Sequence, residues 1–264
     1  MHAMFNHQHM ALDRVLRWHA GETPRPGPDR IIFFPTNRCN LRCVHCWLRW
    51  SEDYDKTYKS ELSDERLLRL VEEGAELGVR QWFFVGGGEP MVRGRVLMRM
   101  FEKIRAHGMD GAVHSNGTLF TPPMLEWFVD NGWMEVWVSL DGPNAEINDS
   151  IRTGGFDKAV DALRRLSELK QARGVVTPRL AINAAITNKT YDKLTQFVEL
   201  THEIGPDITL QLCGLMVDGE GAARLALTPE QKAEYPKYVE AAAARAEELG
   251  VAHNFPQHLD TEYN

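Results

Sequence analysis

Short apolar runs alternate with longer amphipathic stretches along most of the 264-residue chain. Several runs have the length of a strand and are rich in aliphatic and aromatic residues, which is typical of strands that are buried on both faces. The pattern predicts six parallel strands joined by crossover helices, at residues 31–35, 81–85, 111–114, 135–140, 180–187 and 208–213.

Between these runs, apolar residues recur at helical spacing. Ser63 is an N-cap candidate followed by two acidic residues, and Thr121 precedes a proline that suits the first helical position. We expect the final helix to be broken or restarted at Pro236, because proline cannot donate a backbone hydrogen bond. The predicted helices cover residues 64–77, 95–107, 122–131, 156–173, 191–204 and 229–249.

Chemically distinctive loops follow five of the six predicted strands. In a parallel barrel, the functional residues gather on the loops at the C-terminal ends of the strands. We therefore predict the α/β class and, within it, a partial (β/α)6 TIM-like barrel with one site at its mouth. The loops in question are the cysteine-rich segment, the glycines at 86–88, Ser115-Asn116-Gly117, Ser139-Leu-Asp141 and Gln211–Cys213.

The N-terminal part differs from this alternation. Residues 1–20 could form a short amphipathic helix with Met4, Leu12, Val15, Leu16 and Trp18 as its apolar set, and the proline-rich residues 21–28 predict an extended linker. We thus treat residues 1–29 as a tail and linker.

Composition narrows the function classes. The chain is 43% hydrophobic and 25% charged, with a net charge of −7 and a pI near 5.8. This charge argues against a broad nucleic-acid or anionic-membrane surface, and no apolar run is long enough to span a bilayer. With four cysteines, three of them clustered, a reducing cytoplasm is the expected location.

The clustered cysteines are Cys39, Cys43 and Cys46, spaced C-x3-C-x2-C. Three thiolates can hold a soft metal or an iron–sulfur cluster but cannot complete a four-coordinate site. A zinc ion would need a fourth ligand, and the local candidate, His45, adjoins Cys46, so chelation by both is strained. A 4Fe–4S cluster would leave one iron open. The cysteine spacing alone therefore allows either a zinc site or a 4Fe–4S cluster.

A glycine-rich turn, Gly86-Gly87-Gly88-Glu89-Pro90, follows the second predicted strand. Glycines let backbone groups approach a ligand closely, Glu89 can accept a hydrogen bond from an ammonium group, and Pro90 fixes the turn. Taken alone, this segment could equally be an ordinary turn before a helix.

Together, these motifs resemble the radical S-adenosylmethionine (radical SAM) superfamily. The cysteine triplet and Gly-Gly-Glu-Pro are followed in order by a Ser-Asn-Gly turn, a Ser-Leu-Asp-Gly turn and an Arg-x-x-Gly-x-Phe-Asp segment. The resemblance spans roughly residues 31–215. It implies that Cys39, Cys43 and Cys46 hold a 4Fe–4S cluster whose fourth iron binds SAM.

The resemblance also implies roles for individual residues around SAM. Gly87, Gly88 and Glu89 would meet the methionine ammonium, with Pro90 fixing the turn, and Arg152 would bind the carboxylate. Ribose hydroxyls or the methionyl part would meet the turns after the third and fourth strands, and the adenine would meet Leu212 and Cys213 on strand six. The residues implied at those turns are Ser115, Asn116, Ser139 and Asp141.

The chain departs from the family pattern before the third cysteine. The family often has an aromatic residue there, whereas this chain has His45 and places Trp47 after Cys46. Adenine stacking is therefore left open between His45 and Trp47, and Trp47 is our candidate for a cofactor contact. The implied chemistry is reductive cleavage of SAM to a 5′-deoxyadenosyl radical that abstracts hydrogen from a substrate. A flavodoxin- or ferredoxin-type electron donor is implied, and no catalytic acid or base is assigned.

The C-terminal part resembles the subgroup that carries a SPASM or twitch domain. The resemblance to that subgroup implies a peptide or peptide-derived substrate. One alternative substrate is a small metabolite, such as a sugar or cofactor precursor. The alternative to an enzyme is a non-catalytic zinc or cluster protein. Auxiliary-cluster cysteines are absent after Cys213. We expect a core barrel at 30–215 and an extension at 216–264 leading toward an absent auxiliary domain. That portion, or a partner chain, would cover the open side of the barrel.

Overall fold

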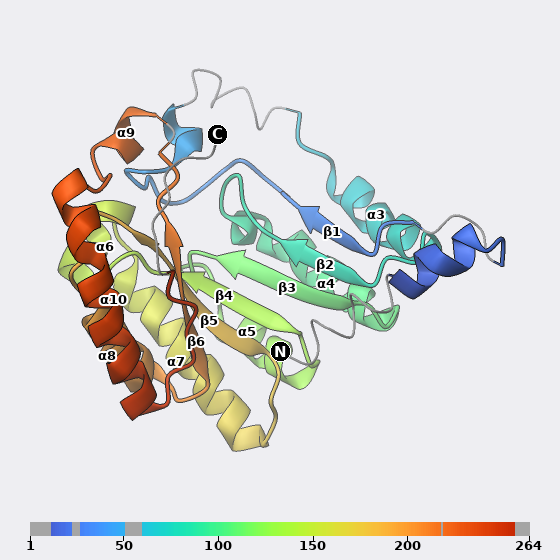
Figure 1. Cartoon of the computed structure of the whole chain (residues 1–264). Coiled ribbons are helices and arrows are strands. Elements are labelled where there is room, and N and C mark those ends of the chain that lie inside the picture. The colour runs from blue at the N-terminus through green and yellow to red at the C-terminus, as the bar shows by residue number, and fades with distance from the viewer. Residues whose placement is uncertain (1–11, 23–26, 51–59, 218, 257–264) are drawn as a thin grey trace.

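The structure is a computed structural model that describes residues 12–22, 27–50, 60–217 and 219–256. Its centre is a single curved sheet in which all the strands are parallel and follow one another in chain order (Figure 1). The strands are β1 (Arg30–Phe33), β2 (Gln81–Phe84), β3 (Asp110–Ser115), β4 (Glu135–Ser139), β5 (Arg179–Ile186) and β6 (Ile208–Gly214).

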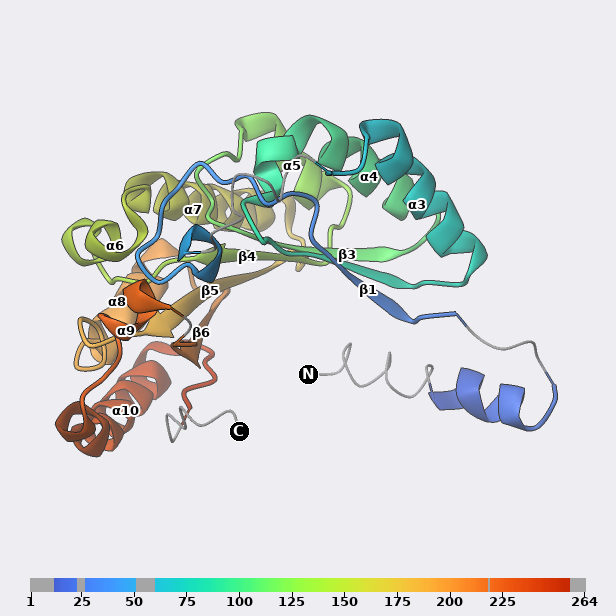
Figure 2. The same cartoon turned by 90° about the horizontal axis from the view of Figure 1, so that it is seen from above.

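Helices connect successive strands and cover one face of this sheet. Figure 2 shows α3, α4, α5 and α7 together on that face, while α8 and α10 pack against each other beside β6. The α-helices are α3 (Asp64–Glu76), α4 (Gly94–Ala106), α5 (Pro122–Asp130), α6 (Ala145–Arg152), α7 (Phe156–Arg173), α8 (Leu194–Ile204), α9 (Glu220–Ala223) and α10 (Pro229–Leu249). Short 3₁₀ turns are η1 (Trp47–Trp50) and η2 (Pro90–Arg93).

The predicted partial barrel is confirmed: six parallel strands form one sheet that does not close. Side chains alternate between the two faces of each strand, and those that face the helices form the core. Trp82 and Phe84 point toward the helices and are buried, and the Phe84 ring lies 4.8 Å from that of Phe101 on α4. Ile32 and Phe34 lie on the opposite face and are each 57% exposed.

Sequence and structure differ in three helical regions. The α10 helix is continuous through Pro236, so the predicted break is wrong. Its buried residues Tyr235 and Val239 join the main core, and a capping box fixes the first turn, which outweighs the hydrogen bond lost at proline. The helix α8 begins only at Leu194, and α6 was not predicted from periodicity.

The C-terminal extension packs on the same core as the barrel. After α10 the chain returns to the free edge of β6, where Leu210 donates to Ala252 (2.8 Å) and accepts from Asn254 (3.3 Å). Parallel pairing at this edge therefore continues the sheet beyond β6. No helix in the described part of the chain is long and apolar enough to cross a membrane.

The N-terminal prediction can be checked only in part, because residues 1–11 lie outside the described ranges. Residues 12–19 are helical, and in Figure 2 this helix projects away from the sheet. Arg14 tethers it through Asp29 and the carbonyl of Gly78. Its apolar residues are exposed: Leu12, Val15, Leu16 and Trp18.

Candidate active site

The distinctive loops of the sequence meet at one cavity of about 380 Å³ at the C-terminal end of the strands. Its volume is in the range of a small-molecule site. Three cysteines, the glycine turn and residues from β3 to β6 contribute to its wall. The lining residues that matter most are Cys39, Cys43, His45, Cys46, Trp47, Gly87, Gly88, Glu89, Pro90, His114, Ser115, Asn116, Ser139, Arg152, Ala185, Cys213 and Met216.

The cysteine loop connects β1 to η1, and its thiols are not in disulfides. Burial raises the pKa of Cys43 to about 11 and also raises that of Cys39. Thiolates at these positions would therefore need a cationic partner, since metal binding is what deprotonates buried thiols.

The glycine turn is shaped by the cysteine loop that crosses it. Gly88 donates to the carbonyl of Thr36 (2.9 Å), and Glu89 donates to that of Arg38 (2.9 Å). A Cβ on Gly88 would lie 2.1 Å from the Arg38 carbonyl oxygen, which a real side chain cannot do. Gly88 thus allows the close contact between the two loops.

Glu89 is buried and binds protein donors with both oxygens. Its Oε1 accepts from Ser115 (2.7 Å) and from the backbone N–H of Met91 (2.9 Å), and Oε2 accepts from the N–H of Asn116 (2.7 Å). A carboxylate oxygen has about two lone pairs, so Oε2 keeps one acceptor position for a ligand. Burial raises the pKa of Glu89, and these bonds oppose that rise.

Asn116 binds the cysteine loop with its side chain. Its Nδ2 donates to Asn40 (2.9 Å), and its Oδ1 accepts from the backbone and hydroxyl of Thr118. Ser115 is likewise occupied by Glu89 and by the N–H of Gly117. These two residues line the cavity, but their polar atoms mainly hold the loops together.

Asp141 and Arg152 form a buried ion pair behind the cavity wall. Arg152 Nη1 lies 2.6 Å from Asp141 Oδ2, and His45 Nε2 lies 3.5 Å from the same oxygen. Burial alone would raise the pKa of Asp141, but the Arg152 charge outweighs it and the pKa is lowered. Asp141 does not line the cavity, whereas Arg152 does.

The inner face of the sheet contributes a group that sequence analysis did not assign. His114 on β3 lies 2.8 Å from the hydroxyl of Ser139 on β4 and 3.3 Å from the amide nitrogen of Asn183 on β5. Burial lowers the pKa of His114 to about 4, so the ring is neutral near pH 7. The alternation of side chains along the strands, combined with the register that pairs Ser139 with Asn183, is the sequence feature that could have placed His114 beside them.

The residues predicted to contact adenine differ in whether they line the cavity. Trp47 is 48% exposed and lines the cavity. Leu212 points into the main core, and its N–H donates to Asn254, while the neighbouring Cys213 lines the cavity. On strand six, Cys213 and the residues after it are therefore the groups that can meet a ligand.

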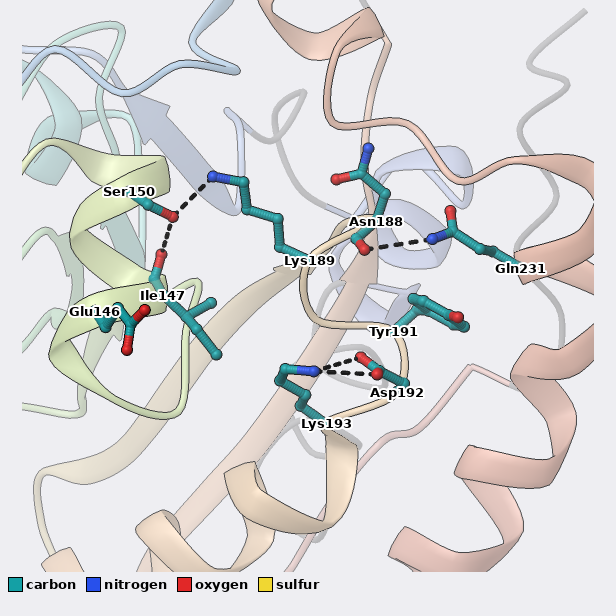
Figure 3. A pocket seen from close by; sticks show the side chains of 9 residues that line it. All are labelled: Glu146, Ile147, Ser150, Asn188, Lys189, Tyr191, Asp192, Lys193 and Gln231. Carbon is teal, nitrogen blue, oxygen red and sulfur yellow. Dashed lines mark hydrogen bonds and ion pairs between the residues drawn. The ribbon is translucent and has the colours of Figure 1, made fainter.

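A second cavity, of about 530 Å³, lies on the outside of the barrel between α6, the β5–α8 loop and α10 (Figure 3). Its lysines bind neighbouring polar or charged atoms: Lys193 bonds to Asp192, and Lys189 to Ser150. It contains no cysteine. The redox chemistry suggested by the sequence therefore belongs to the first cavity.

The donor set of the first cavity fits an iron–sulfur cluster with an amino-acid ligand. Among the described residues, no three His, Cys, Asp or Glu side chains converge on a single-ion position, although three thiols line one wall. Arg152 Nε is buried without a partner, and such an orphaned donor suits an anionic ligand group.

Comparisons with known proteins agree with this donor set. The family model "Radical SAM superfamily" matches residues 33–183. The mycofactocin maturase MftC of Mycolicibacterium smegmatis is 33% identical over 190 residues, which are 71% of this chain and 44% of that protein. An AdoMet-dependent heme synthase of Methanosarcina barkeri is 29% identical over 184 residues, or 67% of this chain and 48% of that protein.

Solved structures show the same fold. Streptococcus suis SuiB bound to S-adenosylmethionine superposes with a TM-score of 0.68 at 16% identity, covering 87% of this chain and 50% of SuiB. Native anSMEcpe with bound AdoMet gives 0.67 at 20% identity, covering 86% and 64%. This chain thus spans about half the length of the curated relatives it matches. With the matched family model covering more than half of its residues, the chain belongs to the radical SAM superfamily.

Proposed function

We propose that this chain is the core of a radical SAM enzyme that modifies a peptide or peptide-derived substrate. When bound, a 4Fe–4S cluster and SAM supply a 5′-deoxyadenosyl radical that abstracts hydrogen from the substrate. Cys39, Cys43 and Cys46 would hold the cluster. The observation that carries the proposal is that these thiols and Arg152, with its unpartnered Nε, line one cavity.

The protein's own contribution is binding, orientation and exclusion of water. Arg152 would bind the SAM carboxylate, and the turn at Gly87, Gly88 and Glu89 would meet the ammonium through backbone groups and the remaining acceptor position of Glu89 Oε2. Ser139 lines the cavity and would face the ribose. Trp47 and Cys213 line the cavity and would meet the adenine.

The peptide assignment rests on the relatives. MftC is named a maturase, and SuiB has been solved bound to its precursor peptide SuiA. A small-metabolite substrate is the second candidate, and it is favoured by a 29% identical GTP 3′,8-cyclase of Petrotoga mobilis. A flavodoxin- or ferredoxin-type protein would supply the electron, and further protein would cover the inner face at Ile32 and Phe34, which are exposed.

Anaerobic reconstitution tests the cofactor assignment. We expect about four irons and four sulfides per chain, as the 4Fe–4S stoichiometry requires, and a change in the electron paramagnetic resonance spectrum of the reduced cluster when SAM is added. Tight binding of one zinc ion with no SAM effect would overturn the proposal. Candidate precursor peptides can then be screened for a mass change that depends on SAM.

The proposed cover can be tested separately by comparing chain 1–264 alone with the same chain plus a candidate partner. We expect substrate turnover to need the added protein. Turnover by a compact monomer of 1–264 would contradict this part of the proposal without affecting the cofactor assignment.

A further inference from the structure

Asp141 follows β4 by two residues and does not line the cavity, and only 2% of its surface is exposed. Its Oδ1 accepts from the N–H of Ala185 on β5 (2.8 Å), and its own N–H donates to Asn148 on α6 (3.0 Å). Its Oδ2 binds Arg152 and lies near His45 in the cysteine loop. Asp141 therefore joins three segments that surround the site.

Arg152 binds Asp141 through only one corner of its guanidinium. The bond uses Nη1, whereas Nε has no partner and Nη2 makes no hydrogen bond to any described residue. In a guanidinium, Nε and Nη2 form one edge with two parallel N–H groups. That edge can bind a carboxylate in the bidentate manner, and Asp141 does not occupy it.

We propose that Asp141 is a positioning residue that fixes Arg152 by Nη1, so that the Nε/Nη2 edge is presented to the methionyl carboxylate of SAM. Asp141 itself does not contact the ribose. This inference rests on the proposed function, and it differs from the role that the sequence resemblance implies for Asp141.

The end of α6 supports this arrangement because it is bonded to the cysteine loop. Val44 donates to the carbonyl of Ile151 (2.8 Å), and Arg42 donates to the hydroxyl of Thr153 (3.0 Å). The backbone of Arg152 is thereby fixed on both sides. What remains free is the rotation of its long side chain, and the Asp141 carboxylate restricts that rotation.

Asp141→Asn is the most direct test, since an amide can still accept from Ala185 but no longer provides a charged acceptor for Arg152. The two probes are SAM and 5′-methylthioadenosine, which keeps the adenine and ribose but lacks the amino and carboxylate groups. We expect the Kd of the reconstituted chain for SAM to rise about tenfold or more, as for loss of a charge-assisted pair. The Kd for 5′-methylthioadenosine should stay the same.

The opposite pattern would overturn the proposal. If Asp141→Asn weakens binding of both probes equally, Asp141 contacts the ribose or adenine side of the ligand. If SAM affinity does not change, Arg152 does not depend on Asp141. Failure of wild-type reconstituted protein to bind SAM would instead refute the proposed function.

Breaking a buried ion pair could prevent folding, so a double variant keeps the test decisive. Asp141→Asn/Arg152→Gln removes both charges together, which costs less than leaving one unpaired. We expect its SAM affinity to equal that of Arg152→Gln alone, because a residue that acts through Arg152 has no effect without it. A further loss in the double variant would contradict the proposal.

Asp207→Asn is a matched control. Asp207 pairs with the buried Lys170 and accepts from Ser167 (2.6 Å), and none of these three residues lines the cavity. The Asp207→Asn variant measures the general effect of removing a paired carboxylate. We expect lower thermal stability and an unchanged ratio of the two Kd values.

Discussion

The His114 imidazole on β3 lines the candidate cofactor cavity. Ser139 and Asn183 hold its Nε2, and the Trp137 ring lies 6.0 Å away. Since an amide nitrogen only donates, its contact with Nε2 favours the tautomer that carries the proton on Nδ1. His114 can therefore offer an N–H to a substrate without changing its charge.

This burial predicts a pH dependence of stability. The folded pKa of His114 is lowered to about 4, below the unfolded value, so the unfolded state binds more protons between these two values. Stability is lost as pH falls from about 6.5 toward 4, by at most about 2 kcal/mol between pH 7 and 5. Urea unfolding of wild type and His114→Gln at both pH values measures it.

In that comparison, the variant should lose less stability than wild type as the pH falls, because glutamine does not titrate. Equal losses in both proteins would show that His114 is already protonated in the fold or is open to water. Proton NMR of the His114 ring provides a second measurement, and we expect no change in its chemical shift between pH 6 and 8.

At the scale of elements, the cysteine loop and the glycine turn act as one unit. A Cβ on Gly88 would meet the backbone of Asn37 and Arg38, which cannot move aside as a flexible side chain can. We expect Gly88→Ala to reduce the free energy of unfolding by about 2 kcal/mol or more. The cluster content after reconstitution should fall as well, since the two loops separate.

Gly94→Ala is the matched control for this substitution. A Cβ there would meet only the flexible ends of Met124 and Met91, and Gly94 is the first residue of α4. Alanine should be neutral or slightly stabilising in that helix. Equal effects of the two substitutions in thermal unfolding would refute a specific role for the Gly88 contact.

Helix α10 supplies another test, because Pro236 lies inside it. Pro236→Ala restores a backbone N–H that can donate to the carbonyl of Lys232, so we expect stability to rise by about 1 to 3 kcal/mol. Denaturant unfolding checks this. A decrease would mean that the proline supports the local path of the chain near Tyr235, whose hydroxyl donates to the Pro256 carbonyl.

Most elements could be predicted from sequence, since apolar periodicity and caps are local. The helix α7 has the predicted ends, Phe156 and Arg173. Periodicity did not identify α6, an eight-residue helix with few buried positions, and local rules overestimated the effect of Pro236. Tertiary packing carries α10 through Pro236, whereas α6 begins at a side-chain cap, Asn144, which accepts from the N–H of Ile147.

For the site, the motifs predicted which loops meet but not how each polar atom is used. Glu89 and Asn116 form most of their hydrogen bonds with neighbouring loops, and Asp141 binds Arg152. The role of His114 depends on the register of three strands. Such contacts join residues far apart in the chain, so a single sequence cannot specify them.

At the scale of the whole molecule, one sheet positions all the candidate chemistry. Parallel strands bring the loops after β1, β2, β3, β4 and β6 to the same end, where they form one cavity. Helices cover one face, while Ile32 and Phe34 are exposed on the other. Under the proposed function, this arrangement would hold the cofactors at the rim and leave the inner face for the substrate and for further protein.

The proposed function requires that Cys39, Cys43 and Cys46 hold a cluster that cleaves SAM. The most direct measurement is the yield of 5′-deoxyadenosine and methionine from anaerobically reconstituted protein given dithionite and SAM. We predict both products from wild type and neither from Cys43→Ala. Equal yields from the two proteins, or none from wild type that carries a full cluster, would contradict this role of the three cysteines.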